Sequence, residues 1–274
     1  MVEISPGRVV LVTGASTGIG RLCAERLAAA GWRVFGGARS VTATAPASRA
    51  NLDWLPMDVT DDASVRAVID KILATTGRLD AIVNNAGFSM RGSVEDVPME
   101  QARAIFETNF FGALRVCRAA APALRAHGGY IVNISSLAGL VGLPFTAHYC
   151  ASKFALEGLS ESLRYELRPY GVHVVLVEPG DYRTGIQVSR RISAETQQGV
   201  YARAFDAFLQ KRQAFEARSA TAEPVAALVE KILNDPRPKL RYVIAMPGQG
   251  LLPLLRRLLP QGLYESCFRR LLGS

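Results

Sequence analysis

Residues Arg8 to Gly31 read RVVLVTGASTGIGRLCAERLAAAG, and this stretch decides the fold. The β-branched run from Arg8 to Thr13 predicts a short strand buried on both faces. Small residues follow as far as Gly20, and a helical pattern then runs to a glycine stop at Gly31. A strand, a glycine turn and a helix N-terminus together offer backbone N–H donors to a pyrophosphate. We therefore expect a dinucleotide-binding α/β fold.

The glycine spacing of this turn is G-x-x-x-G-x-G, at Gly14, Gly18 and Gly20. It differs from the more general G-x-G-x-x-G fingerprint of dinucleotide sites. A plain glycine-rich turn is the alternative interpretation, and the flanking strand and helix argue against it.

The end of the second predicted strand, Arg33 to Ala38, indicates which dinucleotide binds. Enzymes that use NAD place an acidic residue there, where it accepts hydrogen bonds from the adenosine ribose. This chain has Arg39 and Ser40 instead, so no carboxylate repels a 2′-phosphate and Arg39 can pair with one. The sequence favours NADP(H) over NAD(H), with a solvent-facing Arg39 as the alternative.

Five further apolar runs alternate with helical patterns along the chain. The helices are expected at about residues 61–76, 99–127, 148–170 and 225–232. The strands are expected at Leu52 to Met57, Leu79 to Val83, Gly129 to Ile134, Val172 to Val177 and Leu240 to Ile244. The alternation predicts one Rossmann-type domain over residues 1–274, a doubly wound, seven-stranded parallel sheet with helices on both faces.

Tyr149 and Lys153 are four positions apart and share a face if this stretch opens a helix. A lysine ammonium near a phenol favours the phenolate and lowers its pKa, which makes Tyr149 a candidate general acid or base. Ser136, thirteen positions earlier, can hydrogen-bond the same substrate oxygen. Alone, a Tyr-x-x-x-Lys pair is more often an exposed tyrosine beside a solvated lysine.

The motifs occur in an order that resembles the short-chain dehydrogenase/reductase (SDR) family, loosely its 17β-hydroxysteroid and retinol dehydrogenase-like branch. The resemblance covers about residues 6 to 185. It rests on TGASTGIG at 13–20, DV at 58–59, NNAG at 84–87, NISS at 133–136, YCASK at 149–153 and EPGDYRT at 178–184.

The resemblance implies site residues of three kinds. Catalysis is expected from Asn109, Ser136, Tyr149 and Lys153, with Asn109 holding a water that links the lysine to solvent. Cofactor contacts are expected from Gly14, Ser16, Thr17, Gly18, Ile19, Gly20, Arg39, Ser40, Asp58, Val59, Asn85, Ala86, Gly87, Tyr149, Lys153, Pro179, Gly180 and Thr184. Substrate contacts are expected from Phe88, Ser136, Leu137, Leu143, Phe145 and Tyr149.

The sequence gives less specific predictions for two regions after the last motif. The segment at about 185–220 is polar and helical, and the resemblance implies a substrate lid there. The extension at about 249–274 combines leucines with arginines, broken by Pro253 and Pro260. It can form an ordinary amphipathic helix, cover an apolar channel, pack on a second subunit or make peripheral contact with an acidic membrane.

Composition limits the alternatives. The net charge of +8 is scattered, with no basic stripe of the kind that binds nucleic acid. The four cysteines form no C-x-x-C pattern, so neither a metal site nor a disulfide framework is expected. No secretory leader and no membrane-length apolar run is visible, which favours a cytoplasmic protein. Small residues along the helix after Tyr149 resemble the dimer-forming helix of the family and imply a homodimer or homotetramer.

The predicted activity is hydride transfer between NADP(H) and a carbonyl or alcohol, with Tyr149 as the acid or base. Apolar residues around the serine favour a steroid, retinoid, aryl or lipid-like substrate. A 3-oxoacyl thioester reductase is a second hypothesis, and a non-catalytic NADP(H)-binding sensor or scaffold is a third. The filled catalytic positions argue against the third.

Overall fold

The computed structural model describes residues 7–39, 51–183, 190–217, 219–246 and 248–272. Its main sheet has seven parallel strands in the order β3-β2-β1-β4-β6-β7-β9, which confirms the predicted sheet. The strands are β1 (Val9–Thr13), β2 (Arg33–Ala38), β3 (Leu52–Pro56), β4 (Ala81–Asn84), β6 (Gly129–Ile134), β7 (Val172–Pro179) and β9 (Arg241–Ile244).

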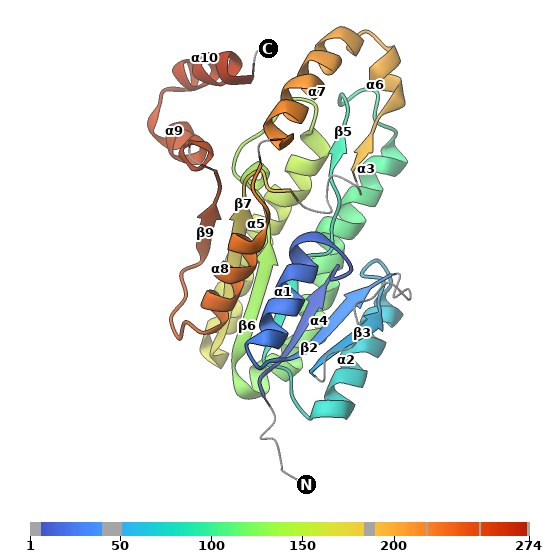
Figure 1. Cartoon of the computed structure of the whole chain (residues 1–274), viewed down its shortest axis with the longest axis vertical. Coiled ribbons are helices and arrows are strands. Elements are labelled where there is room, and N and C mark those ends of the chain that lie inside the picture. The colour runs from blue at the N-terminus through green and yellow to red at the C-terminus, as the bar shows by residue number, and fades with distance from the viewer. Residues whose placement is uncertain (1–6, 40–50, 184–189, 218, 247, 273–274) are drawn as a thin grey trace.

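Helices cover both faces of this sheet (Figure 1). One face carries α1 (Gly18–Ala29) and α8 (Glu223–Leu233). The other carries α2 (Asp62–Thr76), α4 (Gly112–His127) and α5 (Ala147–Leu167).

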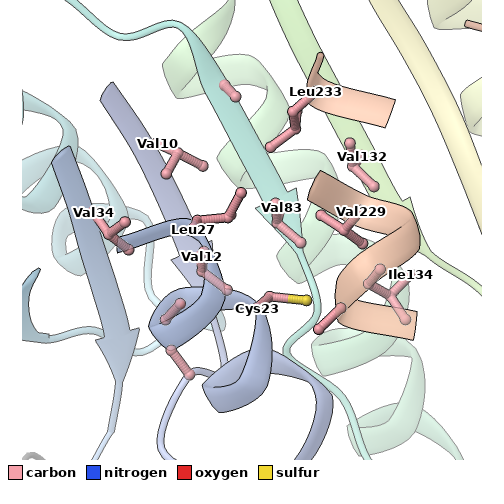
Figure 2. Packing of buried hydrophobic residues seen from close by; sticks show 14 of the residues in the cluster. Val10, Val12, Cys23, Leu27, Val34, Val83, Val132, Ile134, Val229 and Leu233 are labelled. Atoms are coloured by element: carbon pink, nitrogen blue, oxygen red, sulfur yellow. The ribbon is translucent and has the colours of Figure 1, made fainter. Parts of the chain in front are cut away.

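The strands are apolar on both sides because both sides are covered. Successive residues of β1 alternate between the two cores: Val9 and Leu11 pack under α2 and α4, and Val10 and Val12 pack under α1 and α8. Figure 2 shows the second of these cores, where Leu27 of α1 lies among the strand valines.

The strand order reverses at β1. The chain moves outward from β1 through β2 to β3 and then returns to β4 on the other side of β1, so that Val10 is paired with both Val34 and Ala81. A crevice opens at the carboxyl ends of the strands where the order of an α/β sheet reverses. The fold therefore predicts a ligand-binding crevice at the carboxyl ends of β1 and β4.

A second, two-stranded sheet was not predicted. Its parallel strands are β5 (Met90–Arg91) and β8 (Arg191–Ile192). They lie beyond the carboxyl ends of the main strands together with α6 (Ala194–Gln198) and α7 (Ala202–Ala217), as Figure 1 shows. The first residues of the expected lid, 185–189, lie outside the described residues.

The segment expected as one helix over 99–127 has three parts. These are α3 (Met99–Phe106), a π-helical turn (Glu107–Phe111) and α4. Pro122 lies inside α4, which continues through it to His127. The π turn marks the position of Asn109, and single π turns are frequent at functional sites.

The C-terminal segment lies beyond β9 at the edge of the molecule (Figure 1). It forms α9 (Leu252–Leu258) and α10 (Gln261–Leu272), separated at Pro260. Leu254, Leu258 and Leu263 are exposed on it. Within the described ranges, no helix combines the length and the apolar character that crossing a membrane requires.

Candidate active site

A cavity of about 550 Å³ opens at the carboxyl ends of the strands. Its wall joins the glycine turn after β1, the ends of β2, β4, β6 and β7, the start of α5, and parts of β5, β8 and α7. Residues predicted from separate motifs therefore meet in one place.

The glycine turn fits the backbone of a dinucleotide. Gly14 has a φ of 62°, and a Cβ there would lie 2.7 Å from Cα of Ala86. Gly20 lies behind the turn, where a Cβ would come within 2.5 Å of the Gly14 carbonyl oxygen. Both positions exclude a side chain, so the turn presents bare backbone to the cavity.

Helix α1 begins within this turn, at Gly18, and the first N–H groups of a helix have no partner inside the helix. Its N-cap residue, Thr17, makes no side-chain cap hydrogen bond. Ser16, Thr17, Gly18 and Ile19 line the cavity. N–H groups left without a cap, and the positive end of the helix dipole, are suited to a phosphate.

Arg39 lies on the cavity wall at the end of β2, and its side chain is exposed. Asp58 and Val59 line the cavity with it. Burial opposes the charge of Asp58, but hydrogen bonds from Thr60 and the charges of Arg39 and Arg115 leave its pKa below the usual value. Ser40, which was predicted beside Arg39, lies outside the described residues.

Thr13 joins the loop after β4 to the end of β1, a contact that the sequence did not predict. Its Oγ1 accepts hydrogen bonds from the N–H groups of Asn85 and Ala86, each at 3.0 Å. The Asn85 side chain donates to the carbonyl oxygens of Thr13 and Gly14. Asn85, Ala86 and Gly87 all line the cavity, as predicted. A threonine at a strand end gives no distinct pattern.

Tyr149 and Ser136 lie together on the cavity wall. Burial raises the pKa of Tyr149 to about 12, and the hydrogen bond from the Ser136 side chain opposes that rise. The interval between Tyr149 and Lys153 predicted that the lysine lowers the pKa of the phenol. In this structure burial outweighs every lowering influence, so the neutral phenol is the favoured form.

Lys153 is buried, with 5% of its surface exposed. Its Nζ donates to the carbonyl oxygen of Ile134 at 2.8 Å and lies 5.9 Å from the centre of the Tyr149 ring. Burial lowers the pKa of Lys153 to about 8. Lys153 lies four residues after Tyr149 on α5, and both side chains line the same cavity.

Asn109 lies behind the wall rather than on it. Its Oδ1 accepts from the Phe88 N–H at 3.0 Å, and its Nδ2 donates to the Phe88 carbonyl and to Ser152 Oγ. Both amide N–H donors are therefore used. A water held by Asn109, as the resemblance implies, would need the backbone carbonyl or the second lone pair of Oδ1.

Three predicted substrate contacts, Phe88, Leu137 and Leu143, line the cavity. Phe145 does not. It has a φ of 52° and packs behind the wall, with its ring centre 5.1 Å from that of Phe205 and 5.5 Å from that of Phe208. Phe208, from α7, does line the cavity.

Pro179 and Gly180 at the end of β7 line the cavity as predicted, and Thr184 lies outside the described residues. The neighbouring wall is rich in charge that the motifs did not reveal. It includes Arg91, Asp181, Arg190, Arg191, Arg212 and Glu216.

Neither metal binding nor disulfide chemistry is visible in the described residues. No group of three or more His, Cys, Asp or Glu side chains there is placed to hold a metal ion. Cys23, Cys117 and Cys150 are free and buried, and Cys267 lies outside the described side chains. Burial raises the pKa of the Cys23 and Cys117 thiols to about 12.

The sequence profile described as short chain dehydrogenase matches residues 8–195, more than half of the chain. The chain belongs to the short-chain dehydrogenase/reductase family. As a member of this SDR family it is an oxidoreductase that binds a nicotinamide dinucleotide.

Three SDR proteins illustrate the likeness. The chain is 35% identical over 264 residues to 3-ketodihydrosphingosine reductase of Bacteroides thetaiotaomicron, covering 96% of this chain and 97% of that protein. It is 35% identical over 266 residues to human 17-beta-hydroxysteroid dehydrogenase type 1, covering 90% and 80%. A solved SDR from Burkholderia phymatum in complex with NAD is 28% identical, with a TM-score of 0.78 and coverage of 92% and 93%.

Proposed function

We propose that the protein is an NADP(H)-dependent oxidoreductase that interconverts a ketone or aldehyde and an alcohol on a largely apolar substrate. The observation that carries this proposal is the meeting of Ser136, Tyr149 and Lys153 with the glycine turn on the wall of one cavity. The dinucleotide supplies or accepts the hydride. The chain must then hold the substrate oxygen and move one proton.

In reduction, the Tyr149 hydroxyl donates its proton to the carbonyl oxygen, and Ser136 hydrogen-bonds the same oxygen. The raised pKa of Tyr149 keeps that proton in place at neutral pH. In oxidation, the phenol must first lose its proton. The positive charge of Lys153 and that of an oxidised nicotinamide ring beside the phenol would both favour the phenolate during oxidation of the alcohol.

The proposed preference for NADP(H) rests on Arg39. The guanidinium lies on the cavity wall after β2, where no acidic residue precedes it in the strand. A planar guanidinium pairs well with a phosphate.

The proposed substrate class rests on the wall around Tyr149. Phe88, Leu137, Val141, Leu143 and Phe208 line it. The relatives named above carry the names of a sphingoid ketone reductase and a steroid dehydrogenase. Both names denote bulky lipid-like substrates, which such a wall would accommodate.

A 3-oxoacyl thioester reductase remains the second candidate. The arginines of the wall, Arg91, Arg190, Arg191 and Arg212, would suit the anionic end of such a substrate. A sensor that binds NADP(H) without turnover is the third.

A homodimer or homotetramer is proposed from α5. Its small residues Ala151, Gly158 and Ser162 are exposed, and a Cβ at Gly158 would meet nothing within 4 Å. A partner helix could approach closely there.

The test is the oxidation of NADPH, beside NADH, measured with steroid, aryl and aliphatic ketones and 3-oxoacyl thioesters. We expect turnover with NADPH on bulky apolar ketones. A preference for NADH would contradict the role of Arg39. Tight NADPH binding without turnover of any carbonyl would favour the sensor.

A further inference from the structure

The cavity wall carries more positive than negative side chains at a place that the proposed proton transfer does not use. Four arginines face two carboxylates there. We call these six residues the arginine cluster: Arg91, Arg190, Arg191, Arg212, Asp181 and Glu216.

Glu216 is already shared by three arginines. Its Oε1 accepts from Nη2 of Arg91 at 2.5 Å and from Nη2 of Arg190 at 2.8 Å, and its Oε2 accepts from Nη1 of Arg190 at 3.0 Å. Arg212 Nη2 lies 3.9 Å from Oε1. Both carboxylate oxygens are thus occupied, while the guanidinium groups keep further N–H donors.

Asp181 is occupied as well. Both of its oxygens accept from Arg212, and Oδ2 also accepts from Nε2 of Gln249 at 2.7 Å. The Gln249 Oε1 accepts in turn from the Asp181 N–H at 3.1 Å. The second carboxylate is therefore also fully engaged.

Part of this excess positive charge lies on side chains that are largely shielded from solvent. The side chains of Arg91 and Arg190 are only 7% and 12% exposed. An uncompensated charge at such a site is costly unless an anion joins it. Arg191 is the exposed member of the cluster, and its guanidinium carbon lies 4.5 Å from the centre of the Phe88 ring.

The β5–β8 sheet fixes the backbone of Arg91 and Arg191. The Arg191 N–H donates to the Ser89 carbonyl and the Ser193 N–H donates to the Arg91 carbonyl, both at 2.9 Å. Arg190 Nε also donates to Ser89 Oγ at 3.3 Å. The hydrogen bonds to Glu216 and Ser89 hold the guanidinium groups of Arg91 and Arg190 before a ligand binds, which lowers the entropy cost of binding.

Tyr149 and the arginine cluster line the same cavity. Phe88 lies between them in the contacts of this wall: Tyr149 packs against the apolar cluster that contains Phe88, and the guanidinium of Arg191 lies over the Phe88 ring. A substrate whose carbonyl oxygen meets Tyr149 can therefore extend along Phe88 to the arginine cluster.

We propose that the arginine cluster is a subsite for an anionic group, such as a carboxylate, phosphate or sulfate, at one end of the substrate. The inference rests on the proposed function and narrows it to amphipathic ketones or alcohols with one acidic end. The apolar body would lie along Phe88 and Phe208. The guanidinium planes would take the anion by paired hydrogen bonds.

The anion could instead belong to the cofactor, whose phosphates are also negative. The experiment therefore measures substrate selectivity and cofactor affinity separately. The probes are benzoylpropionate and its methyl ester, which share a ketone and differ in charge. The proteins are wild type, Arg190→Gln, Arg191→Gln and the control Arg203→Gln, an exposed arginine of α7 outside the cavity wall.

We expect wild type to reduce the acid with a kcat/KM at least about ten-fold above that of the ester, the scale of one charge-assisted hydrogen bond. Arg190→Gln and Arg191→Gln should bring this ratio to within about two-fold of unity, and Arg203→Gln should leave it unchanged. NADPH dissociation constants, from fluorescence titration, should stay the same in all four proteins.

Two results would overturn the proposal. One is a wild-type ratio near unity. The other is an unchanged ratio with weaker NADPH binding in Arg190→Gln, which would assign the arginines to the cofactor. If no carbonyl is reduced at all, calorimetric binding of benzoylpropionate to the NADPH complex still decides. Binding that Arg190→Gln and Arg191→Gln abolish would support the subsite while the proposed reaction fails.

Discussion

The glycine turn and the arginine cluster are parts of one cavity wall, yet they are built in different ways. The turn consists of neighbouring residues, Gly14 to Gly20, and offers backbone N–H groups. The cluster consists of long side chains from distant segments, and Arg91 meets Glu216 across 125 positions. A site made of local backbone leaves a compact pattern in the sequence, whereas a site made of distant side chains leaves none.

Tyr149 lines the same cavity as these two regions, and its replacement should have the largest effect. Tyr149→Phe removes the transferable proton, so kcat should fall by about a thousand-fold, within the usual range for a general acid. NADPH binding should stay within about two-fold, because the phenol contributes little to holding phosphates. Stopped-flow turnover and fluorescence titration measure the two quantities.

The matched control is Tyr165→Phe, since Tyr165 is on the same helix and is 76% exposed. It should leave both quantities unchanged. Near-normal turnover in Tyr149→Phe would remove Tyr149 from the chemistry.

Gly14→Ala should affect the glycine turn and leave the arginine cluster unchanged. The new Cβ would lie 2.7 Å from Cα of Ala86, so the turn must shift, and overpacking of this kind costs about 1–3 kcal/mol. We expect NADPH affinity to fall by at least about ten-fold, together with thermal stability.

Gly31→Ala is the control, because Gly31 also has a positive φ, of 88°, but its Cβ would meet nothing within 4 Å. It should lower the melting temperature without changing NADPH affinity. Equal affinity losses in the two variants would mean that the close approach at Gly14 has no special role.

Arg39→Ala should shift the preference between the two dinucleotides. Losing one charged partner of a phosphate should reduce the NADPH:NADH ratio of kcat/KM by about ten-fold, with little change in the NADH value. Arg66→Ala, at an exposed arginine of α2, serves as the control. If the ratio is the same in Arg39→Ala and wild type, Arg39 faces solvent in the complex.

Glu216→Gln should have the smallest effect on the reaction and should act only on the arginine cluster. It leaves Arg91, Arg190 and Arg212 without the carboxylate that they share, so α7 should open more readily. We expect faster amide exchange in α7, a KM raised about three-fold for ketones, and unchanged NADPH affinity.

Asp206→Asn is the control, since Asp206 is an exposed residue of α7. Slower or unaltered amide exchange in Glu216→Gln would show that the shared carboxylate does not hold the helix.

The sequence predicted what depends on local pattern. Buried strands appear as apolar runs, and the spacing of Ser136, Tyr149 and Lys153 selected three residues that do line one cavity. It failed where long-range contacts decide. β5 and β8 have two residues each and exist only because they pair.

The predicted and the observed site also differ where the environment of a side chain decides its role. Phe145 and Phe208 are both apolar, and only the packing of α7 decides which one reaches the cavity wall. The pKa of Tyr149 depends on how deeply the phenol is covered, which the four-residue interval to Lys153 does not reveal.

The pairing of β1 with β4 has a consequence for how the chain reaches this state. Val9 donates its N–H to Asp80 Oδ2 at 2.7 Å across 71 positions, and the register of β1 and β4 brings Val10 beside Ala81. During synthesis, the edge of β1 that pairs with β4 must therefore wait unpaired until β4 has been made. Such distant pairing is slow, because a long loop must close first. The dinucleotide crevice lies at this seam, so a nascent chain gains the ability to bind the coenzyme only after the centre of its sheet is complete.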